Sequence, residues 1–322
     1  MTLTTAILTI ILSSIVIFFS AKRFAKSSSA IGDYLNLPRD VKGATFDAVS
    51  SSMPELLVAL FSIIFFQKFE VGIGTIAGSA LFNLLIIPGI CVFVAPVAFT
   101  VSRKVISRDA LFYMASIFVL IVLLMYFKTW GLLIAIILLA TYLVYVYEII
   151  IHTRKHQEKN NHNNTKSKIS KEVFPFIFNF IIIGIFTFFL TRSSIDLSTL
   201  LGVSPIIIAF TITAAATSIP DTIISIVNAK NGDVDDATSN VFGSNIFDIL
   251  VGIGLPLLIY TIYQGSVIIE FANLEIVLGL LGSTILILYF FADTHTLNKK
   301  HGFTLLLMYL VFVSYTVYLA VV

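Results

Sequence analysis

The chain has few charged residues and almost no cysteine. Only 12 % of its 322 residues are Asp, Glu, Lys or Arg, whereas 58 % are hydrophobic. About a quarter of an ordinary soluble domain is charged, so these charges are too few to cover a soluble core of this size. The single cysteine, Cys91, excludes a disulfide framework and a cysteine-ligated metal. No glycine-rich phosphate-binding loop is present, which argues against an ATP-driven pump.

Long hydrophobic runs take the place of the missing charge. Residues 3–19, 110–127 and 132–147 contain no charged side chain and approach the length that crosses a bilayer. The first run lacks the basic start and the cleavage site of a signal peptide, so we expect it to be retained. The pattern predicts an all-α polytopic membrane protein with about ten transmembrane helices, over 3–21, 41–66, 70–99, 109–127, 130–151, 173–191, 203–229, 234–262, 270–292 and 302–321.

One polar stretch divides these spans into two sets of five. Residues 152–172 are rich in Lys, Asn, His and Ser and too poor in hydrophobic residues to pack, so they predict a cytoplasmic linker. The predicted repeats are therefore 1–151 and 173–322. Because five is odd, the two halves enter the membrane in opposite directions. Two inverted five-helix repeats are an arrangement that many transporters use to build a site at the membrane midplane.

The basic residues orient this topology. Seventeen of the twenty Lys and Arg residues fall on one side of it, and only Lys68, Lys128 and Arg192 fall on the other. The positive-inside rule then places both termini outside an inner (plasma) membrane. The net charge of +2 thus reflects the topology and gives no reason to expect nucleic-acid binding.

Each half contains a pair of short polar stretches that interrupt the hydrophobic sequence. The residues of the two pairs are nearly the same. Residues 51–55 read Ser-Ser-Met-Pro-Glu and 78–83 read Gly-Ser-Ala-Leu-Phe-Asn. In the second half, 217–221 read Thr-Ser-Ile-Pro-Asp and 243–248 read Gly-Ser-Asn-Ile-Phe-Asp. A carboxylate, hydroxyls and a proline inside a membrane span are costly, so a matched pair of such stretches predicts a functional site.

The acids inside the predicted spans have no basic partner in those spans. Asp47, Glu55, Asp221 and Asp248 lie within them, and Glu275 lies near an end, where we expect it to reach the outer interface. Each buried acid is therefore protonated or paired with a mobile cation. Carboxylates, an amide oxygen and hydroxyls are hard ligands suited to Na⁺, K⁺ and Ca²⁺.

Proline and glycine suggest how these spans are shaped. Pro54 and Pro220 lack an N–H group and clash with the preceding turn, so each is expected to open its helix and free backbone carbonyls. Glycines are expected to let the helices approach closely at Gly72, Gly74, Gly78 and Gly243.

These residues resemble the two alpha-repeats of the cation/Ca²⁺ exchanger superfamily, and most closely those of its K⁺-dependent Na⁺/Ca²⁺ exchangers. The similarity covers 43–95 and 204–258 and includes Val-Gly-Ile-Gly-Thr-Ile-Ala-Gly-Ser-Ala-Leu-Phe-Asn at 71–83. The large regulatory loop of the animal exchangers is absent between the halves, which is typical of a minimal, prokaryotic-type transporter. The resemblance implies a secondary antiporter, not an enzyme, that exchanges Na⁺ for Ca²⁺ by alternating access at a midplane carboxylate site.

The resemblance also implies a set of ligands. Glu55 and Asp221 would be the two central carboxylates, and Asn83 and Asp248 would complete the site from the following helices. An Asp at the position of Asp248 is associated with K⁺ transport in the K⁺-dependent branch, although some Na⁺/Ca²⁺ exchangers carry it too. Hydroxyls would come from Ser51, Ser52, Thr217, Ser218, Ser79 and Ser244, and backbone carbonyls from Ala48 and Ala214.

The same residues permit more than one function. The same carboxylates permit H⁺/Ca²⁺ exchange, and K⁺ co-transport is an option rather than a requirement. A membrane-embedded aspartyl enzyme using Asp221 and Asp248 is disfavoured, because the Gly-x-Gly-Asp setting of such proteases is absent. Asp47 departs from the family pattern and is expected at a hydrated vestibule, where it attracts cations or carries an extra proton. No cofactor is expected, and the bilayer and the transported Na⁺, Ca²⁺ and K⁺ or H⁺ are the predicted partners; the sequence does not predict an oligomeric state.

Overall fold

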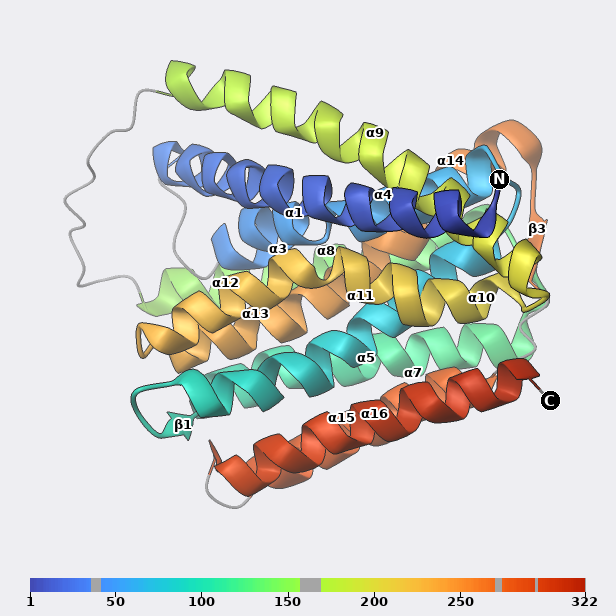
Figure 1. Cartoon of the computed structure of the whole chain (residues 1–322). Coiled ribbons are helices and arrows are strands. Elements are labelled where there is room, and N and C mark those ends of the chain that lie inside the picture. Colours follow the sequence, from blue (N-terminus) through green and yellow to red (C-terminus); the bar gives the residue numbers. More distant parts are fainter. Residues whose placement is uncertain (36–41, 157–168, 270–273, 293–294, 322) are drawn as a thin grey trace.

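The fold is a bundle of long helices, seen in a computed structural model that describes residues 1–35, 42–156, 169–269, 274–292 and 295–321 (Figure 1). The first half contains α1 (Leu3–Tyr34), η1 (Gly43–Asp47), α3 (Ala48–Ser51), α4 (Met53–Ile64), α5 (Phe69–Val94), α6 (Arg103–Val105), η2 (Ile106–Ala110), α7 (Leu111–Tyr126) and α8 (Leu132–His156). The second contains α9 (Ser170–Leu201), α10 (Pro205–Ile208), η3 (Ala209–Thr213), α11 (Ala214–Thr217), α12 (Ile219–Lys230), α13 (Val234–Phe247), η4 (Asp248–Gly252), α14 (Ile253–Gln264), α15 (Leu274–Ala292) and α16 (Lys299–Val321). The η elements are single π-helical stretches.

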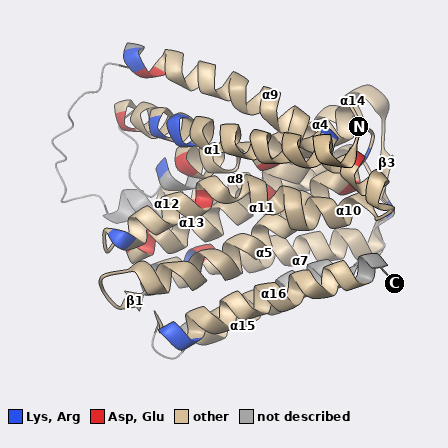
Figure 2. Ribbon diagram, viewed as in Figure 1, with Lys and Arg blue, Asp and Glu red and all other residues tan. Residues whose placement is uncertain are grey.

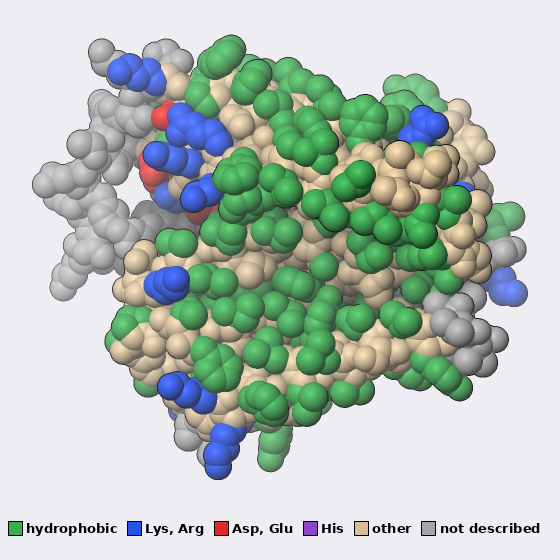
Figure 3. All heavy atoms as spheres, in the orientation of Figure 1, with side chains coloured by type: hydrophobic (Ala, Val, Ile, Leu, Met, Phe, Trp, Pro, Cys, Tyr) green, Lys and Arg blue, Asp and Glu red, His purple; other side chains and the backbone are tan. Residues whose placement is uncertain are grey.

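The helices have the length and composition of membrane spans. Seven of those in the described ranges can cross a bilayer on their own, and nine can if each of two bent helix pairs counts as one span. Large hydrophobic side chains cover the flank of the bundle (Figure 3). Leu8, Leu12 and Phe19 of α1 and Phe174 of α9 are each more than half exposed. Such a surface is suited to contact with lipid tails. The prediction of a polytopic helical membrane protein is therefore confirmed, and the count of ten spans stays a prediction.

Two helices are much longer than their predicted spans. α1 and α9 lie side by side along the edge of the bundle and each runs for 32 residues. At about 1.5 Å per residue they exceed the roughly 30 Å hydrocarbon layer. Arg192, which we expected in a loop, lies inside α9, and the helix ends only where Gly202 adopts a left-handed conformation.

Other boundaries differ from prediction for local reasons. α5 ends at Val94 rather than at residue 99, because Ala95 precedes Pro96 and takes an extended conformation. α8 continues to His156 and α9 begins at Ser170, so only part of the predicted linker 152–172 lies between them, and 157–168 is outside the described residues. The side chain of Glu275 is also outside them.

The loops contain short strands that the all-α prediction did not include. β1 (Phe99–Thr100) pairs with β4 (Thr296–Leu297), and β2 (Thr129–Trp130) pairs with β3 (Val267–Ile268), both antiparallel. Each ladder joins a loop of the first half to a loop of the second. The ladders thus fasten the two halves together at their loops.

The basic residues are concentrated at one end of the bundle. Both chain termini lie at one end, and Lys and Arg gather mainly at the opposite end, where α1 stops and α9 starts (Figure 2). We call this the basic end. Termini on one face agree with an even number of spans.

Candidate cation-binding site

Each half contains a helix that is bent at its polar stretch. The axes of the helices before and after Ser52 differ by 56°, and those around Ser218 differ by 43°. Pro54 and Pro220 follow two residues later, and without an N–H group they cannot continue the hydrogen-bond ladder across the bend. A π-helical stretch, η1 or η3, precedes each bend. The predicted interruption of both helices is confirmed, and the predicted freeing of backbone carbonyls stays a prediction.

Glycines bring α5 against the bent helix of the other half. A Cβ atom on Gly74 would lie 2.7 Å from Ile206 Cγ1, and one on Gly78 would overlap the carbonyl oxygen of Phe210. Gly72 likewise faces α4 within 3.0 Å. Gly243 does not have this role, because the nearest atom to a Cβ there is the Tyr145 hydroxyl at 3.8 Å. Close approach is thus confirmed for three glycines and wrong for Gly243.

Hydroxyl groups link the two halves in matching pairs. Ser52 Oγ lies 2.7 Å from Ser244 Oγ, and Ser218 Oγ donates to Ser79 Oγ at 2.8 Å. Ser52 and Ser218 occupy equivalent places in the two polar stretches, as do Ser79 and Ser244. Each bend of one half therefore meets the straight helix of the other, and each contact has its counterpart.

The central carboxylates sit beside these serines. Ser244 Oγ donates to Asp221 Oδ2 at 2.7 Å, and Ser79 Oγ lies 3.3 Å from Glu55 Oε1 and 3.4 Å from Asp248 Oδ2. Glu55, Asp221 and Asp248 are fully buried. None of them takes part in the ion pairs found among the described residues.

The halves differ in charge at one pair of equivalent positions, Asn83 and Asp248. Asn83 donates through Nδ2 to Asp221 Oδ2 at 3.0 Å and to Asn245 Oδ1 at 3.1 Å. Asp248 occupies the equivalent place in the second half, and an ionised carboxylate has no N–H to donate. The Glu55 side of the site therefore lacks the amide donor that serves Asp221.

Four side-chain oxygens in this cluster are buried and accept no hydrogen bond. They are Glu55 Oε2, Asn83 Oδ1, Asp221 Oδ1 and Asp248 Oδ1. An unsatisfied buried acceptor costs about 1–3 kcal/mol, and more when charged. Hard oxygens in this state are suited to a cation that supplies the missing partner.

The remaining predicted ligands are close to the cluster but already engaged. The carbonyl oxygen of Ala48 accepts from Ser52 N and Ser51 Oγ, and that of Ala214 accepts from Ser218 N and Thr217 Oγ1. These carbonyls would become ligands only if the hydroxyls turned away. Within the described ranges no three Asp, Glu, His or Cys side chains converge as a ready-made metal cluster.

The structure adds one residue to the cluster that sequence reasoning did not select. Asn245 is fully buried, accepts from Asn83 and donates to the carbonyl oxygen of Ala80 at 3.0 Å. It lies in the quoted 243–248 stretch, but its counterpart in the first half is Ala80, so the repeat gave no matched polar pair to point to it.

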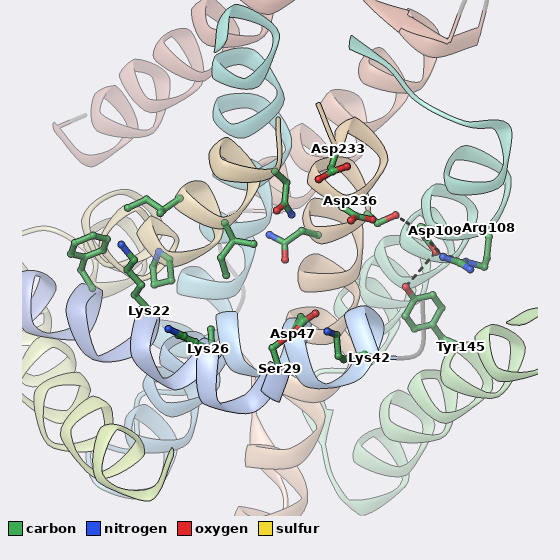
Figure 4. A pocket seen from close by; sticks show the side chains of 18 residues that line it. Lys22, Lys26, Ser29, Lys42, Asp47, Arg108, Asp109, Tyr145, Asp233 and Asp236 are labelled. Atoms are coloured by element: carbon green, nitrogen blue, oxygen red, sulfur yellow. Dashed lines mark hydrogen bonds and ion pairs between the residues drawn. The ribbon is translucent and has the colours of Figure 1, made fainter. Parts of the chain in front are cut away.

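A cavity of about 570 Å³ opens beside the site at the basic end (Figure 4). Pro220, next to Asp221 in the chain, and Asn240, whose Nδ2 lies 3.5 Å from the Asp221 carbonyl oxygen, both line it. Asp47 lies in the wall and is part-buried, which agrees with the vestibule position expected for it. The charged lining residues are Lys22, Lys26, Lys42, Asp47, Arg108, Asp109, Asp233 and Asp236.

Solved structures and known sequences resemble this chain along most of its length. The sodium-calcium exchanger NCX_Mj, soaked with 100 mM Na⁺ and 10 mM Sr²⁺, superposes with a TM-score of 0.67 over 97 % of this chain and 99 % of that one, at 20 % identity. That likeness concerns the fold. An uncharacterized membrane protein of Methanocaldococcus jannaschii is 24 % identical over 305 residues, which cover 94 % of this chain and 95 % of that protein.

A second relative is similar only in part. The human sodium/potassium/calcium exchanger 3 is 38 % identical over 135 residues, which are 40 % of this chain but only 20 % of the human protein. The chain thus aligns with about a fifth of that relative's length.

The family model described as sodium/calcium exchanger protein matches residues 5–151 and 171–318. Because this match takes in nearly all of both halves, the chain belongs to the sodium/calcium exchanger protein family of the cation/Ca²⁺ exchanger superfamily.

Proposed function

We propose that the protein is a secondary antiporter that exchanges Na⁺ for Ca²⁺ at the cluster around Glu55, Asp221 and Asp248. The observation that carries the proposal is the set of four buried oxygens without hydrogen-bond partners, two from each half. A structural polar network would satisfy its own acceptors. Oxygens left unsatisfied at the centre of the bundle are instead suited to a partner that comes and goes.

Charge balance explains why such a site would exchange ions. With the three acids ionised, the empty site carries three negative charges. Opposite unit charges about 4 Å apart attract by roughly 4 kcal/mol at an effective dielectric constant near 20. The loaded site is therefore much easier to carry through a conformational change than the empty one, which couples the movement of one ion to the return of another.

The same count defines the ion sets that neutralise the site. Three Na⁺ balance three carboxylates, and so does one Ca²⁺ with one monovalent cation such as K⁺. Ca²⁺ alone leaves one negative charge, so the third carboxylate is the feature that would favour a co-transported monovalent cation. H⁺ bound to one acid would serve the same purpose and defines the second candidate, H⁺/Ca²⁺ exchange.

The architecture supports alternating access between two inverted five-helix repeats in a ten-span arrangement. Equivalent bends and reciprocal serine contacts relate the halves. The cavity lined by Pro220, here called the vestibule, opens at the basic end. The positive-inside rule assigns this end to the cytoplasm and places both termini outside. In this proposal the structure is open toward the inside, and closing the vestibule would accompany exposure of the site to the outside.

Ion flux into proteoliposomes tests the proposal. Uptake of ⁴⁵Ca²⁺ is measured while Na⁺, K⁺ and pH gradients are imposed one at a time. We expect an outward Na⁺ gradient to drive uptake, and Glu55→Gln and Asp221→Asn to abolish it in correctly folded protein. Uptake driven by a pH gradient and indifferent to Na⁺ would instead establish H⁺/Ca²⁺ exchange, and unchanged flux in both variants would show that the site lies elsewhere.

A further inference from the structure

A second buried polar cluster lies in the vestibule wall, outside the set of predicted ligands. Arg108 donates to Asp109 through Nε at 2.6 Å to Oδ1 and through Nη2 at 3.0 Å to Oδ2. Tyr145 of α8 donates to Asp109 Oδ1 at 3.4 Å, and Ser239 of α13 donates to Oδ2 at 3.1 Å (Figure 4). Asp109 is the first residue of the predicted span 109–127, yet only 1 % of its side chain is exposed.

The two-pronged ion pair makes Asp109 a poor candidate for binding transported ions. Its charge is neutralised by Arg108, and both carboxylate oxygens already accept hydrogen bonds. A buried carboxylate paired in this way holds its neighbours in place rather than attracting a free cation. What it holds is α13, through Ser239.

α13 joins this cluster to the ion site. Ser239 and Gly243 lie one turn apart on the same face of the helix, and the Tyr145 hydroxyl lies beside Gly243. The next residue is Ser244, whose hydroxyl donates to Asp221. The segment of α13 that carries Ser239 therefore leads directly to Ser244, which contacts the proposed ligand Asp221.

A second connection runs through the residue after Ser239. Asn240 Nδ2 lies 3.1 Å from Ser225 Oγ and 3.5 Å from the Asp221 carbonyl oxygen, so it ties α13 to α12. The start of α13 is tied to the first half as well, because Asp235 Oδ1 accepts from Ser102 N at 2.7 Å. α13 is thus held between the 102–109 segment of one half and the bent helix of the other.

We propose that Ser239, held by Asp109, is a positioning residue for the cation site. The Asp109–Ser239 hydrogen bond sets the place of α13 along and about its axis, and thereby the distance from Ser244 to Asp221. Displacement of this helix would misplace Ser244, Asn245 and Asp248 together, because all three follow on the same continuous helix. The inference rests on the proposed exchange function.

The test compares the KM for Ca²⁺ among three single variants in Na⁺-loaded proteoliposomes. Ser239→Ala removes the donor, and Ser239→Thr keeps a hydroxyl at the half-buried position. Ser116→Ala is the matched control, because Ser116 donates only within its own helix α7, to Phe112 O at 2.8 Å. We expect Ser239→Ala to raise the KM about two- to tenfold, as the net loss of one hydrogen bond would, with the maximal rate per folded transporter nearly unchanged. Ser239→Thr and Ser116→Ala should retain the wild-type KM.

A binding readout on the full-length protein in detergent separates positioning from stability. The increase in melting temperature is measured against Ca²⁺ concentration for each variant. The half-saturating Ca²⁺ concentration should rise for Ser239→Ala alone. A lower melting temperature with unchanged KM and half-saturation would overturn the inference, as would a raised KM in Ser239→Thr. Absence of Na⁺-driven uptake in the wild type would contradict the proposed function instead, while the binding curves would still decide the role of Ser239.

Discussion

Asn83 donates a hydrogen bond to Asp221 across the interface between the two halves, with Nδ2 3.0 Å from Oδ2. The equivalent contact in the other direction would join Asp248 to Glu55, and it cannot form between two ionised carboxylates. A nearly symmetric site is therefore asymmetric in charge. Glu55 and Asp248 need a cation or a proton between them, whereas Asp221 receives a hydrogen bond from the Asn83 amide.

Asp248→Asn is expected to change which ions accompany Ca²⁺. The substitution removes one negative charge, so Ca²⁺ alone neutralises the site, and it supplies an amide donor toward Glu55. We expect Ca²⁺ uptake to lose any stimulation by K⁺ and to require fewer Na⁺ per Ca²⁺. The measurement is ⁴⁵Ca²⁺ uptake as a function of K⁺ and Na⁺ at fixed Ca²⁺.

Asn83→Asp is the matched reciprocal substitution. It brings a fourth carboxylate into the cluster and removes the donor to Asp221, so we expect uptake to fall at least about tenfold, which corresponds to roughly 1.4 kcal/mol. Equal activity in Asn83→Asp and wild type would show that the charge count does not govern transport.

Ser244→Ala is expected to weaken Ca²⁺ binding. Ser244 donates to a buried carboxylate at 2.7 Å and contacts Ser52, so its removal leaves another Asp221 lone pair without a donor. A hydrogen bond to a charged group contributes about 1.5–3 kcal/mol, so a rise of about tenfold or more in the KM for Ca²⁺ is expected. Thr141→Ala in α8 removes a hydroxyl whose exposed hydrogen bond goes only to its own helix, to Ile137 O, and should not alter the KM.

Gly78→Ala is expected to destabilise the fold. The new Cβ would overlap the Phe210 carbonyl oxygen, which belongs to a helix that cannot yield without moving the bend of the second half. Overpacking of this kind costs about 1–3 kcal/mol, so the melting temperature and the yield of monodisperse protein should fall. Gly184→Ala provides the control, because nothing lies within 4 Å of a Cβ there. A stable Gly78→Ala protein would mean that α5 and η3 are farther apart than in this structure.

Asp47→Asn is expected to act through long-range electrostatics. Asp47 lies in the vestibule wall rather than among the site residues. Loss of its charge should lower the initial rate of Ca²⁺ entry from the basic end by about two- to threefold at low ionic strength, where the Debye length is about 30 Å at 0.01 M salt. At about 1 M salt the difference should vanish. A rate difference that persists at high salt would place Asp47 in contact with the ion.

Much of the fold could be predicted from local pattern. The hydrophobic runs located the helices, and Pro54 and Pro220 located the bends, because a missing N–H acts on the residues next to it. Helix ends were predicted less well. α9 continues through Arg192 because its end is determined by Gly202 and by packing against α1, rather than by the first charge after the hydrophobic run.

The candidate site could be predicted as a set of residues but not as an arrangement. Repetition identified the carboxylates and serines in each half, and the structure gathers them at the interface of the halves. Repetition in the sequence did not identify Asn245, which has no polar counterpart. It also did not identify Asp109, whose burial depends on Arg108, Tyr145 and Ser239 together. Gly243 was assigned a close approach that its surroundings do not require.

The amino-acid sequence alone is enough to predict that this protein belongs in a membrane, that it has two related halves and that each half carries acids without basic partners. These properties depend on composition and on short patterns, which act through solvation and through the bonding of neighbouring residues. Helix packing, by contrast, brings Ser52 to Ser244 and Asn83 to Asp221, and it places a neutralised Asp109 where it holds α13 beside the site. Those contacts join residues more than a hundred positions apart, so they exist only once the helices have packed.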